Sequence, residues 1–233
     1  MPKNSTDQKD DNRNPPQDVK AIRQEIRKFL DTDVNRRKLG NCKFGVYVFY
    51  DYDGEPIYVG QTYETLRQRI SRHLTNQRTD AVAMNVLDPF EVAEIEVWPF
   101  WHLPTGKANL QKARKTLHAG EYTVFQIVLK SSSFKAVLNE KDVSPTTKID
   151  LPTSHRARII PNSLYEARKH PDTRIARRAS TIANLARVIS EREVSPGLRR
   201  TLLTQARRLE KLAAERFKVF GDRIPVKPDA DEE

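Results

Sequence analysis

Alternating apolar positions in the central part of the chain predict a β-hairpin. Residues 46–50 and 57–60 are rich in β-branched and aromatic side chains, as strands are. The Asp53-Gly54 pair between them is a strong signal for a tight turn. The pattern therefore predicts two antiparallel strands joined at these two residues.

This turn determines which side chains share a face of the hairpin. Tyr47 should pair with Gly60 and Phe49 with Tyr58, which makes the two tyrosines diagonal neighbours about 7–8 Å apart at the backbone. The opposite face carries a mostly apolar set suited to a core: Val46, Val48, Tyr50, Ile57 and Val59. We expect one face to pack and the other to present phenols. Ordinary half-buried strand tyrosines would give the same pattern.

Apolar residues at every fourth position predict an amphipathic helix over residues 62–74, with Thr62 as its N-cap. Its buried stripe consists of Leu66, Ile70 and Leu74. Arg69 and His73 lie four residues apart and three residues after members of that stripe. They should therefore form a row along the edge of the stripe and not on the solvated back of the helix.

Glu121 lies on the apolar face of another predicted helix. Leu117 precedes it by four residues, and Val124 and Val128 follow by three and seven. A carboxylate in such a place is costly unless it is paired or bound to a cation. The alternatives are a core glutamate neutralised by an arginine and a metal ligand.

The last third of the chain predicts two long helices, at 173–191 with Asp172 as N-cap and from Ser195-Pro196 to about 220. The short loop between them favours an antiparallel hairpin. The expected apolar stripes are Ile175, Ala179, Ile182, Ala186 and Ile189, then Leu198, Leu202, Leu209, Leu212 and Phe217.

The fold class expected from these elements is α+β, with a three-stranded antiparallel sheet flanked by helices and a basic helical hairpin at the C-terminal end. The third strand lies at 92–98, and a helix at 18–30 precedes the sheet. The expected divisions are a disordered tail at 1–17, an N-terminal helix and lead-in at 18–42, a catalytic unit at 43–143, a connector at 144–171, the hairpin at 172–220 and an acidic tail at 221–233.

The chain of 233 residues has a formal net charge of +10, and the excess is concentrated near its end. Residues 154–220 hold 16 Lys and Arg against six Asp and Glu. Such a footprint suits the phosphates of nucleic acid; an acidic protein or an anionic lipid surface is the competing explanation. The arginines expected to grip DNA are Arg174, Arg177, Arg178, Arg199, Arg200, Arg207 and Arg208. A purely structural hairpin is the alternative.

The single cysteine, Cys42, leaves no disulfide framework and no cysteine-based zinc site. No apolar run approaches the ~18 residues of a membrane span. We therefore expect a cytoplasmic protein without a membrane partner.

Two tripeptides and four later residues resemble the GIY-YIG nuclease superfamily. The tripeptides are Gly45-Val46-Tyr47 and Tyr58-Val59-Gly60, with valine in place of each isoleucine. The family's helical arginine and histidine correspond to Arg69 and His73, its glutamate to Glu121 and a later asparagine to Asn139. The resemblance covers roughly residues 43–141. Gln61 stands where many members have lysine.

This resemblance implies a nuclease that hydrolyses phosphodiester bonds. Glu121 would hold Mg²⁺, with Mn²⁺ as an alternative, and Arg69 would bind the phosphate oxygens. Tyr47 would orient or deprotonate the water, helped by His73 or Tyr58. Gln61 and Asn139 would lie near the substrate.

The function expected is an endonuclease acting on double-stranded DNA, of the restriction or mobile-element kind, with a dimer or two successive nicks for a double-strand break. The alternatives are a catalytically inactive DNA-binding protein and a structure-specific repair or recombination nuclease. Action on RNA is a weaker alternative.

Overall fold

The structure is a computed structural model that describes residues 16–75, 88–106, 109–139 and 143–221. In chain order its elements are α1 (Gln17–Leu30), β1 (Asp33–Val34), β2 (Arg37–Lys38), η2 (Leu39–Asn41), β3 (Gly45–Tyr50), β4 (Pro56–Thr62), α2 (Leu66–Thr75), η3 (Pro89–Glu91), β5 (Glu94–Pro99), α4 (Leu110–Ser131), β6 (His155–Arg158), α5 (Asn162–Lys169), α6 (Pro171–Glu191) and α7 (Pro196–Gly221). The expected α+β class is confirmed. The terminal tails predicted at 1–17 and 221–233 fall almost entirely outside the described residues.

The main sheet has four strands in the order β4-β3-β5-β6, and every neighbouring pair is antiparallel. The sequence predicted three. The additional strand β6 comes from the segment 144–171 that was expected to be a connector. Charged residues hide its alternation in the sequence. Arg156 lies opposite Glu96 of β5 in the register and forms a diagonal ion pair with Glu94 at 2.6 Å.

The predicted hairpin register is confirmed, with Tyr47 opposite Gly60 and Phe49 opposite Tyr58. Gly54 has a φ of 74°, the left-handed conformation that this turn requires. A bulge between Phe49 and Tyr50 then shifts the pairing by one residue. Ile57 consequently packs on the same side as Tyr47, not with the opposite apolar set as expected.

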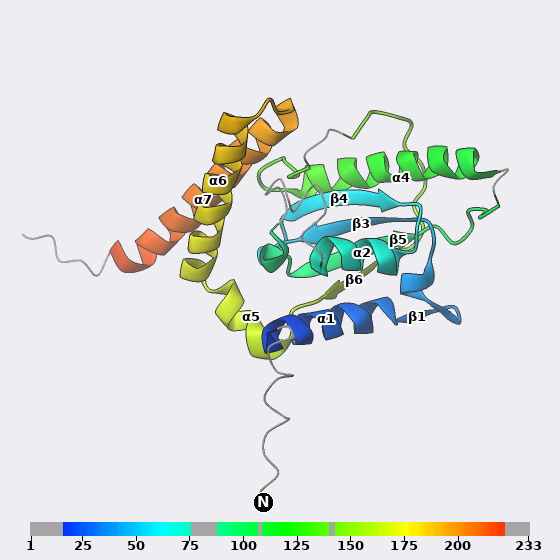
Figure 1. Ribbon diagram of the computed structural model, residues 1–233, viewed down its shortest axis with the longest axis horizontal. Coiled ribbons are helices and arrows are strands. Elements are labelled where there is room, and N and C mark those ends of the chain that lie inside the picture. The colour runs from blue at the N-terminus through cyan, green and yellow to red at the C-terminus, as the bar shows by residue number, and fades with distance from the viewer. Residues whose placement is uncertain (1–15, 76–87, 107–108, 140–142, 222–233) are drawn as a thin grey trace, which may run out of the picture.

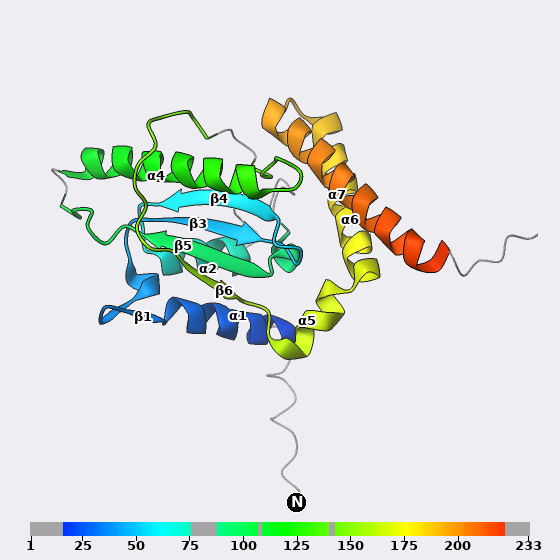
Figure 2. The ribbon, with the colours of Figure 1, turned by 180° about the vertical axis from the view of Figure 1, so that it is seen from behind.

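Helices cover both faces of the sheet (Figures 1 and 2). One core lies between the sheet and helices α1 and α2 and contains Tyr47, Phe49 and Ile70. The other lies under α4 and includes Val46 and Val48. Both faces of the hairpin therefore pack, and the face expected to present phenols has Tyr47 fully buried at 0% exposure.

Helix α2 begins at Leu66 and not at Thr62, because Thr62 is still the last residue of β4. The cap is Thr65. Its Oγ1 accepts a hydrogen bond from the backbone N–H of Gln68 at 3.2 Å, and Gln68 Oε1 accepts one from the Thr65 N–H at 3.2 Å. This reciprocal pair is a capping box, and it starts the helix that carries Arg69 and His73.

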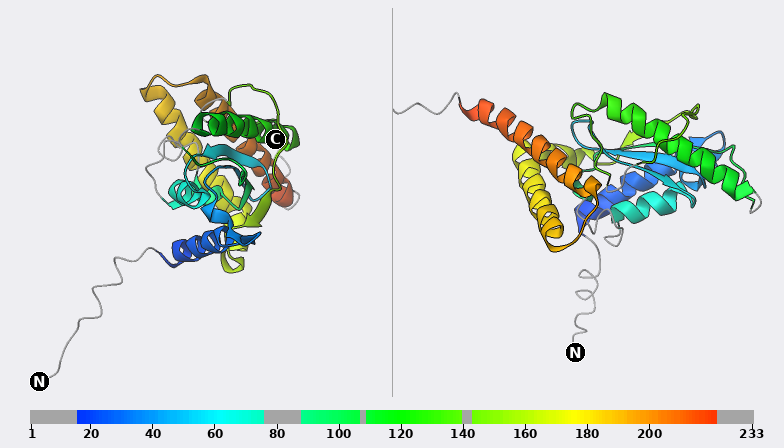
Figure 3. Two further views of the ribbon diagram at one scale, coloured as in Figure 1. Left: turned by 90° about the vertical axis from the view of Figure 1, so that its right-hand side faces the viewer. Right: turned by 90° about the horizontal axis from the view of Figure 1, so that it is seen from above.

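The two C-terminal helices are confirmed as an antiparallel pair at the end of the sheet where β3 leads into β4 (Figure 3). Asp172 is not the N-cap, because His170 Nδ1 accepts from the Asp172 N–H at 3.3 Å. Asp172 instead accepts two hydrogen bonds from Arg216 at 2.8 and 2.7 Å, which joins the start of α6 to the end of α7.

The buried face of α6 lies one residue away from the predicted stripe. It consists of Arg174, Arg178, Thr181, Leu185 and Val188. On α7, Phe217 was expected in the stripe but is 68% exposed. The apolar pattern was misleading because two arginines occupy the buried face of α6.

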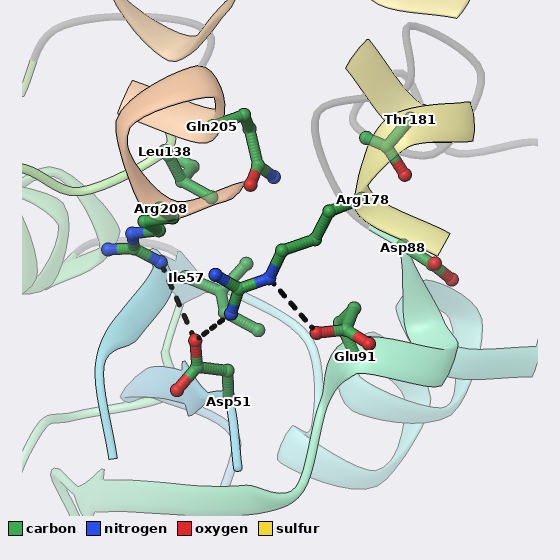
Figure 4. A pocket seen from close by; sticks show the side chains of 9 residues that line it. All are labelled: Asp51, Ile57, Asp88, Glu91, Leu138, Arg178, Thr181, Gln205 and Arg208. Carbon is green, nitrogen blue, oxygen red and sulfur yellow. Dashed lines mark hydrogen bonds and ion pairs between the residues drawn. The ribbon is translucent and has the colours of Figure 1, made fainter. Parts of the chain in front are cut away.

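Those arginines enter a buried ion cluster that docks the hairpin on the sheet. Figure 4 shows part of it, with Asp51 between Arg178 and Arg208 and with Glu91 beside Arg178. Asp51, 2% exposed, lies 2.7 Å from Arg178, 3.5 Å from Arg174 and 3.9 Å from Arg208. Arg174 also donates to both carboxylate oxygens of Asp53, at 2.8 and 2.7 Å. The turn between β3 and β4 therefore doubles as the docking platform of the hairpin.

Glu91 closes the other side of this cluster. Its carboxylate lies 3.5 Å from both Arg174 and Arg178 and 3.2 Å from Arg177. Arg177 further donates to the backbone carbonyls of Phe90 and Arg168. Four of the arginines expected to grip DNA thus hold the protein together: Arg174, Arg177, Arg178 and Arg208.

Within the described residues, no helix combines the length and the apolar character needed to cross a bilayer.

Replacing Asp51 by alanine should lower the free energy of unfolding by about 3–5 kcal/mol, because it leaves buried guanidinium groups without their shared anion. Asp172→Ala is the matched control, since it removes an exposed carboxylate that also binds an arginine, and its effect should be far smaller because solvent screens that pair. Urea denaturation measures both. Equal losses in the two variants would contradict the assigned importance of the cluster.

Candidate active site

The predicted site residues of the hairpin and of α2 meet at the edge strand β4. Arg69 Nε donates to the hydroxyl of Tyr47 at 3.1 Å, and Arg69 also hydrogen-bonds to Tyr58. The rings of Tyr47 and Tyr58 are 6.2 Å apart, and that of His73 lies 5.9 Å from the first and 5.2 Å from the second. The four side chains therefore form one contiguous group.

Gly60 makes room for this group. A Cβ atom on Gly60 would lie 2.6 Å from the hydroxyl oxygen of Tyr47 and 2.8 Å from Cε1 of Tyr58. Any other residue would push one of the phenols away from Arg69. The last residue of the second tripeptide is thus required by close packing and not by its backbone angles.

Tyr47 is held as a neutral phenol. Burial raises its pKa far above the ordinary value, the neighbouring Tyr58 and Glu121 raise it further, and Arg69 opposes them. The hydroxyl oxygen accepts from Arg69, which leaves its own proton directed elsewhere. Tyr47 can lose that proton only when further positive charge comes close.

His73 is also neutral at physiological pH. Burial lowers its pKa to about 3, and the charges of Arg69 and Arg72 act in the same direction. It is 2% exposed, and neither ring nitrogen has a hydrogen-bond partner in the described part of the chain. With its pKa this low the imidazole is a weak proton acceptor, and its contacts in this structure are with the rings of the two phenols.

Glu121 reaches the group from α4, on the other side of β4. Leu117 and Val124 anchor α4 in the core, and Glu121 lies at the edge of that buried face with 14% of its side chain exposed. Burial raises its pKa to about 7, and the charge of Arg69 opposes the rise. No described residue donates a hydrogen bond to it, and His118 Nδ1 lies 3.8 Å from its Oε2.

This carboxylate fits a hard divalent cation. Its oxygens lack protein donors among the described residues, and it points to a place where Arg69 and the phenols also converge. The described residues contain no cluster of three or more His, Cys, Asp or Glu side chains that could enclose an ion. A cation held here would keep most of its coordination positions for water and substrate, as Mg²⁺ commonly does.

Residues 43–104 match the family model of the GIY-YIG catalytic domain. The chain contains a GIY-YIG domain. This is a nuclease domain, and it indicates nuclease activity in general terms. No curated protein and no solved structure gives a significant match to the chain. The matched segment includes both tyrosines, Arg69 and His73 but ends before Glu121, whose assignment rests on the geometry above.

Two further side chains, which the sequence did not indicate, flank the GIY-YIG site. Tyr63 follows β4, and the guanidinium of Arg114 lies 5.2 Å above its ring. Tyr63 also hydrogen-bonds to Gln61. Burial raises the pKa of Tyr63, and the charge of Glu121 raises it further. Arg114 could have been found from helical spacing, because it lies seven residues before Glu121; Tyr63 carries no such signal.

Asn139, expected near the substrate, has both ends of its amide engaged by the backbone of β4. Its amide donates to the carbonyl of Val59 at 2.8 Å and accepts from the Val59 N–H at 3.0 Å. The side chain thereby imitates a strand and closes the edge of β4 next to Tyr58. Its function in this structure is to hold that edge in place.

Among the arginines expected to grip DNA, Arg199, Arg200 and Arg207 are exposed. Thr201 follows Arg200 in the chain. Its Oγ1 donates a hydrogen bond to the carbonyl of Asn139 at 3.5 Å. Because Asn139 lies against β4, the start of α7 lies near the strand that carries the site. Arg199 and Arg200 are thus the part of the basic hairpin best placed to reach a substrate.

Glu121→Gln should change how stability depends on pH. The folded state binds the Glu121 proton more tightly than the unfolded chain, so the stability of the neutral carboxyl is lost as the pH rises from 4.5 through about 7. The amide of the variant does not ionise. Over this range the free energy of unfolding of the variant should therefore rise by roughly 3 kcal/mol relative to that of the native protein. Chemical denaturation at pH 5 and pH 8 measures the difference. A constant difference between the two proteins would contradict the buried state of Glu121.

Proposed function

We propose that the protein is a Mg²⁺-dependent endonuclease that hydrolyses phosphodiester bonds in double-stranded DNA, with Mn²⁺ as an alternative metal. The observation that carries this proposal is Glu121, a buried carboxylate without a hydrogen-bond donor among the described residues, next to the Arg69–Tyr47 pair. A structural glutamate in such a place would be expected to have a partner.

Arg69 is the group that binds the scissile phosphate. It is in contact with both phenols, and its fixed fork of N–H groups has further donors when Nε is engaged by Tyr47. Those donors match the oxygens of a phosphate, whose negative charge increases in the transition state.

Tyr47 orients the attacking water. Tyr47 can accept a proton from the water only after its own hydroxyl has lost one. Burial raises the pKa of that hydroxyl, so the loss requires Arg69 together with added positive charge. The displaced proton leaves to solvent, because the low pKa of His73 makes its imidazole a weak acceptor; His73 instead helps by packing against both tyrosine rings. Tyr58 either relays this proton or holds the two rings in place.

Glu121 is the residue that would hold the cation. A divalent cation bound there would offset the charge of the phosphate and of the leaving oxygen. The raised pKa of Glu121 means that proton and cation compete for the same carboxylate near neutral pH.

The docked hairpin supports action on a defined site. Its orientation relative to β4 is set by the ion cluster at Asp51, so the exposed Arg199 and Arg200 lie at a fixed place relative to the catalytic group. We infer a site-specific enzyme of the restriction or mobile-element kind, working in the cytoplasm. One such site cuts one strand, so a double-strand break requires a homodimer or two successive nicks.

Cleavage of supercoiled plasmid in Mg²⁺ tests the chemistry. We expect discrete products from the native protein, and a loss of about 10²-fold or more in rate for Glu121→Gln or on addition of EDTA. Glu166→Gln, which removes a carboxylate on α5, is the control and should cleave normally. Normal cleavage by Glu121→Gln would refute the metal role. Tight plasmid binding by the native protein without cleavage would favour the inactive DNA-binding alternative.

Arg199→Ala/Arg200→Ala should weaken DNA binding and reduce the slope of log affinity against log salt by about 1.8, because two phosphate contacts are lost. The control is Arg27→Ala/Lys28→Ala, which removes the same charge from exposed positions on α1. Fluorescence anisotropy at several salt concentrations measures both. The assignment of the DNA face fails if the two pairs of substitutions behave alike.

A further inference from the structure

Beside Glu121, α4 carries an imidazole that the hydrolytic scheme does not use. His118 lies three residues before Glu121 on the same face of the helix, with 36% of its side chain exposed. Its Nδ1 is 3.8 Å from Oε2 of Glu121. The imidazole thus lies next to the carboxylate expected to hold the cation, with part of its surface open to solvent.

The separation of the two atoms is informative. At 3.8 Å they are too far apart for a hydrogen bond. Two neighbouring ligands of one octahedral ion, each about 2.1 Å from it, lie roughly 3 Å apart. The partly exposed imidazole can close the remaining gap by rotating about its side-chain torsions, which would place both donors on one ion.

A simple i,i+3 ion pair on the helix surface is the competing explanation. Such a pair needs a protonated imidazole and contributes little when one partner is exposed. It also leaves the Glu121 carboxylate, with only 14% of its side chain exposed, without any donor at hydrogen-bond distance among the described residues. A shared cation satisfies both side chains at once.

We propose that His118 is a second protein ligand of the divalent cation, together with Glu121. This inference rests on the proposed metal role of Glu121 and deepens it. Imidazole binds first-row transition ions in preference to Mg²⁺, whereas carboxylate oxygen suits both. The pair therefore favours Mn²⁺ over Mg²⁺, and His118 supplies that preference.

The surroundings leave the rest of the coordination sphere open. No third His, Cys, Asp or Glu joins the pair among the described residues. Arg114, one turn earlier on α4, is held over the ring of Tyr63. The remaining positions are left for water and for a phosphate oxygen, which an exchangeable catalytic ion requires.

Titration of the full-length protein with Mn²⁺ alone, followed by the EPR signal of the free ion, tests this without any cleavage assay. His118→Ala should weaken Mn²⁺ binding by about 10-fold or more, the scale of losing a metal-site group. The loss of Mg²⁺ affinity, measured by competition, should be clearly smaller. His118→Asp restores a ligand and should recover metal binding, with the preference shifted toward Mg²⁺. The control His170→Ala, at the start of α6, should have the Mn²⁺ affinity of the native protein.

Unchanged Mn²⁺ affinity in His118→Ala, with binding abolished in Glu121→Gln, would overturn the role of His118 and leave the proposed function intact. Unchanged binding in Glu121→Gln would overturn both. Circular dichroism of each variant establishes that it is folded.

Discussion

The antiparallel pairing of β3 with β4 is the constraint on which the rest of the structure depends. At one end of this hairpin, the register places Gly60 opposite Tyr47 and so leaves space for both phenols beside Arg69. At the other end, the turn presents Asp51 and Asp53 to the arginines of the C-terminal helices. A shift of one residue would turn the tyrosines to the α4 face and separate the catalytic group from its docking platform.

Short-range patterns predicted most of the site. The turn signal gave the correct pairing, and the four-residue step between Arg69 and His73 correctly placed both on the edge of α2. The family resemblance added the link to α4, which no local pattern contains. Tyr63 was missed because a single aromatic residue just past a strand has no periodic partner. Ile57 was misplaced because a bulge is a local irregularity that alternation does not reveal.

The arginines were the main error, and its cause is physical. A cluster of positive charge in the sequence indicates a need for anions but not which anions meet that need. Asp51 and Glu91 are more than 80 residues away from Arg174 and Arg178 along the chain, so only the tertiary fold pairs them. The same limitation hid β6, whose arginine pairs with a glutamate of the neighbouring strand. Charge composition correctly favoured nucleic acid but could not separate binding residues from structural ones.

The electrostatics of the site follow from the same burial that forms the core. Tyr47, His73 and Glu121 all have their pKa values moved toward the neutral form by loss of water, and Arg69 alone keeps its charge. Such a group is costly for the fold and is ready to change state when a phosphate and a cation arrive. Stability and reactivity are in direct opposition at these positions.

The ion cluster also bears on how such enzymes are recombined by design. The hairpin and the GIY-YIG domain look like separable parts in the sequence, and exchange of the hairpin would seem a simple route to new cleavage sites. A hairpin moved to a foreign domain would bury Arg174, Arg178 and Arg208 without counterions unless Asp51, Asp53 and Glu91 moved with it. The transferable module is therefore the hairpin together with the turn and the 3₁₀ segment that neutralise it.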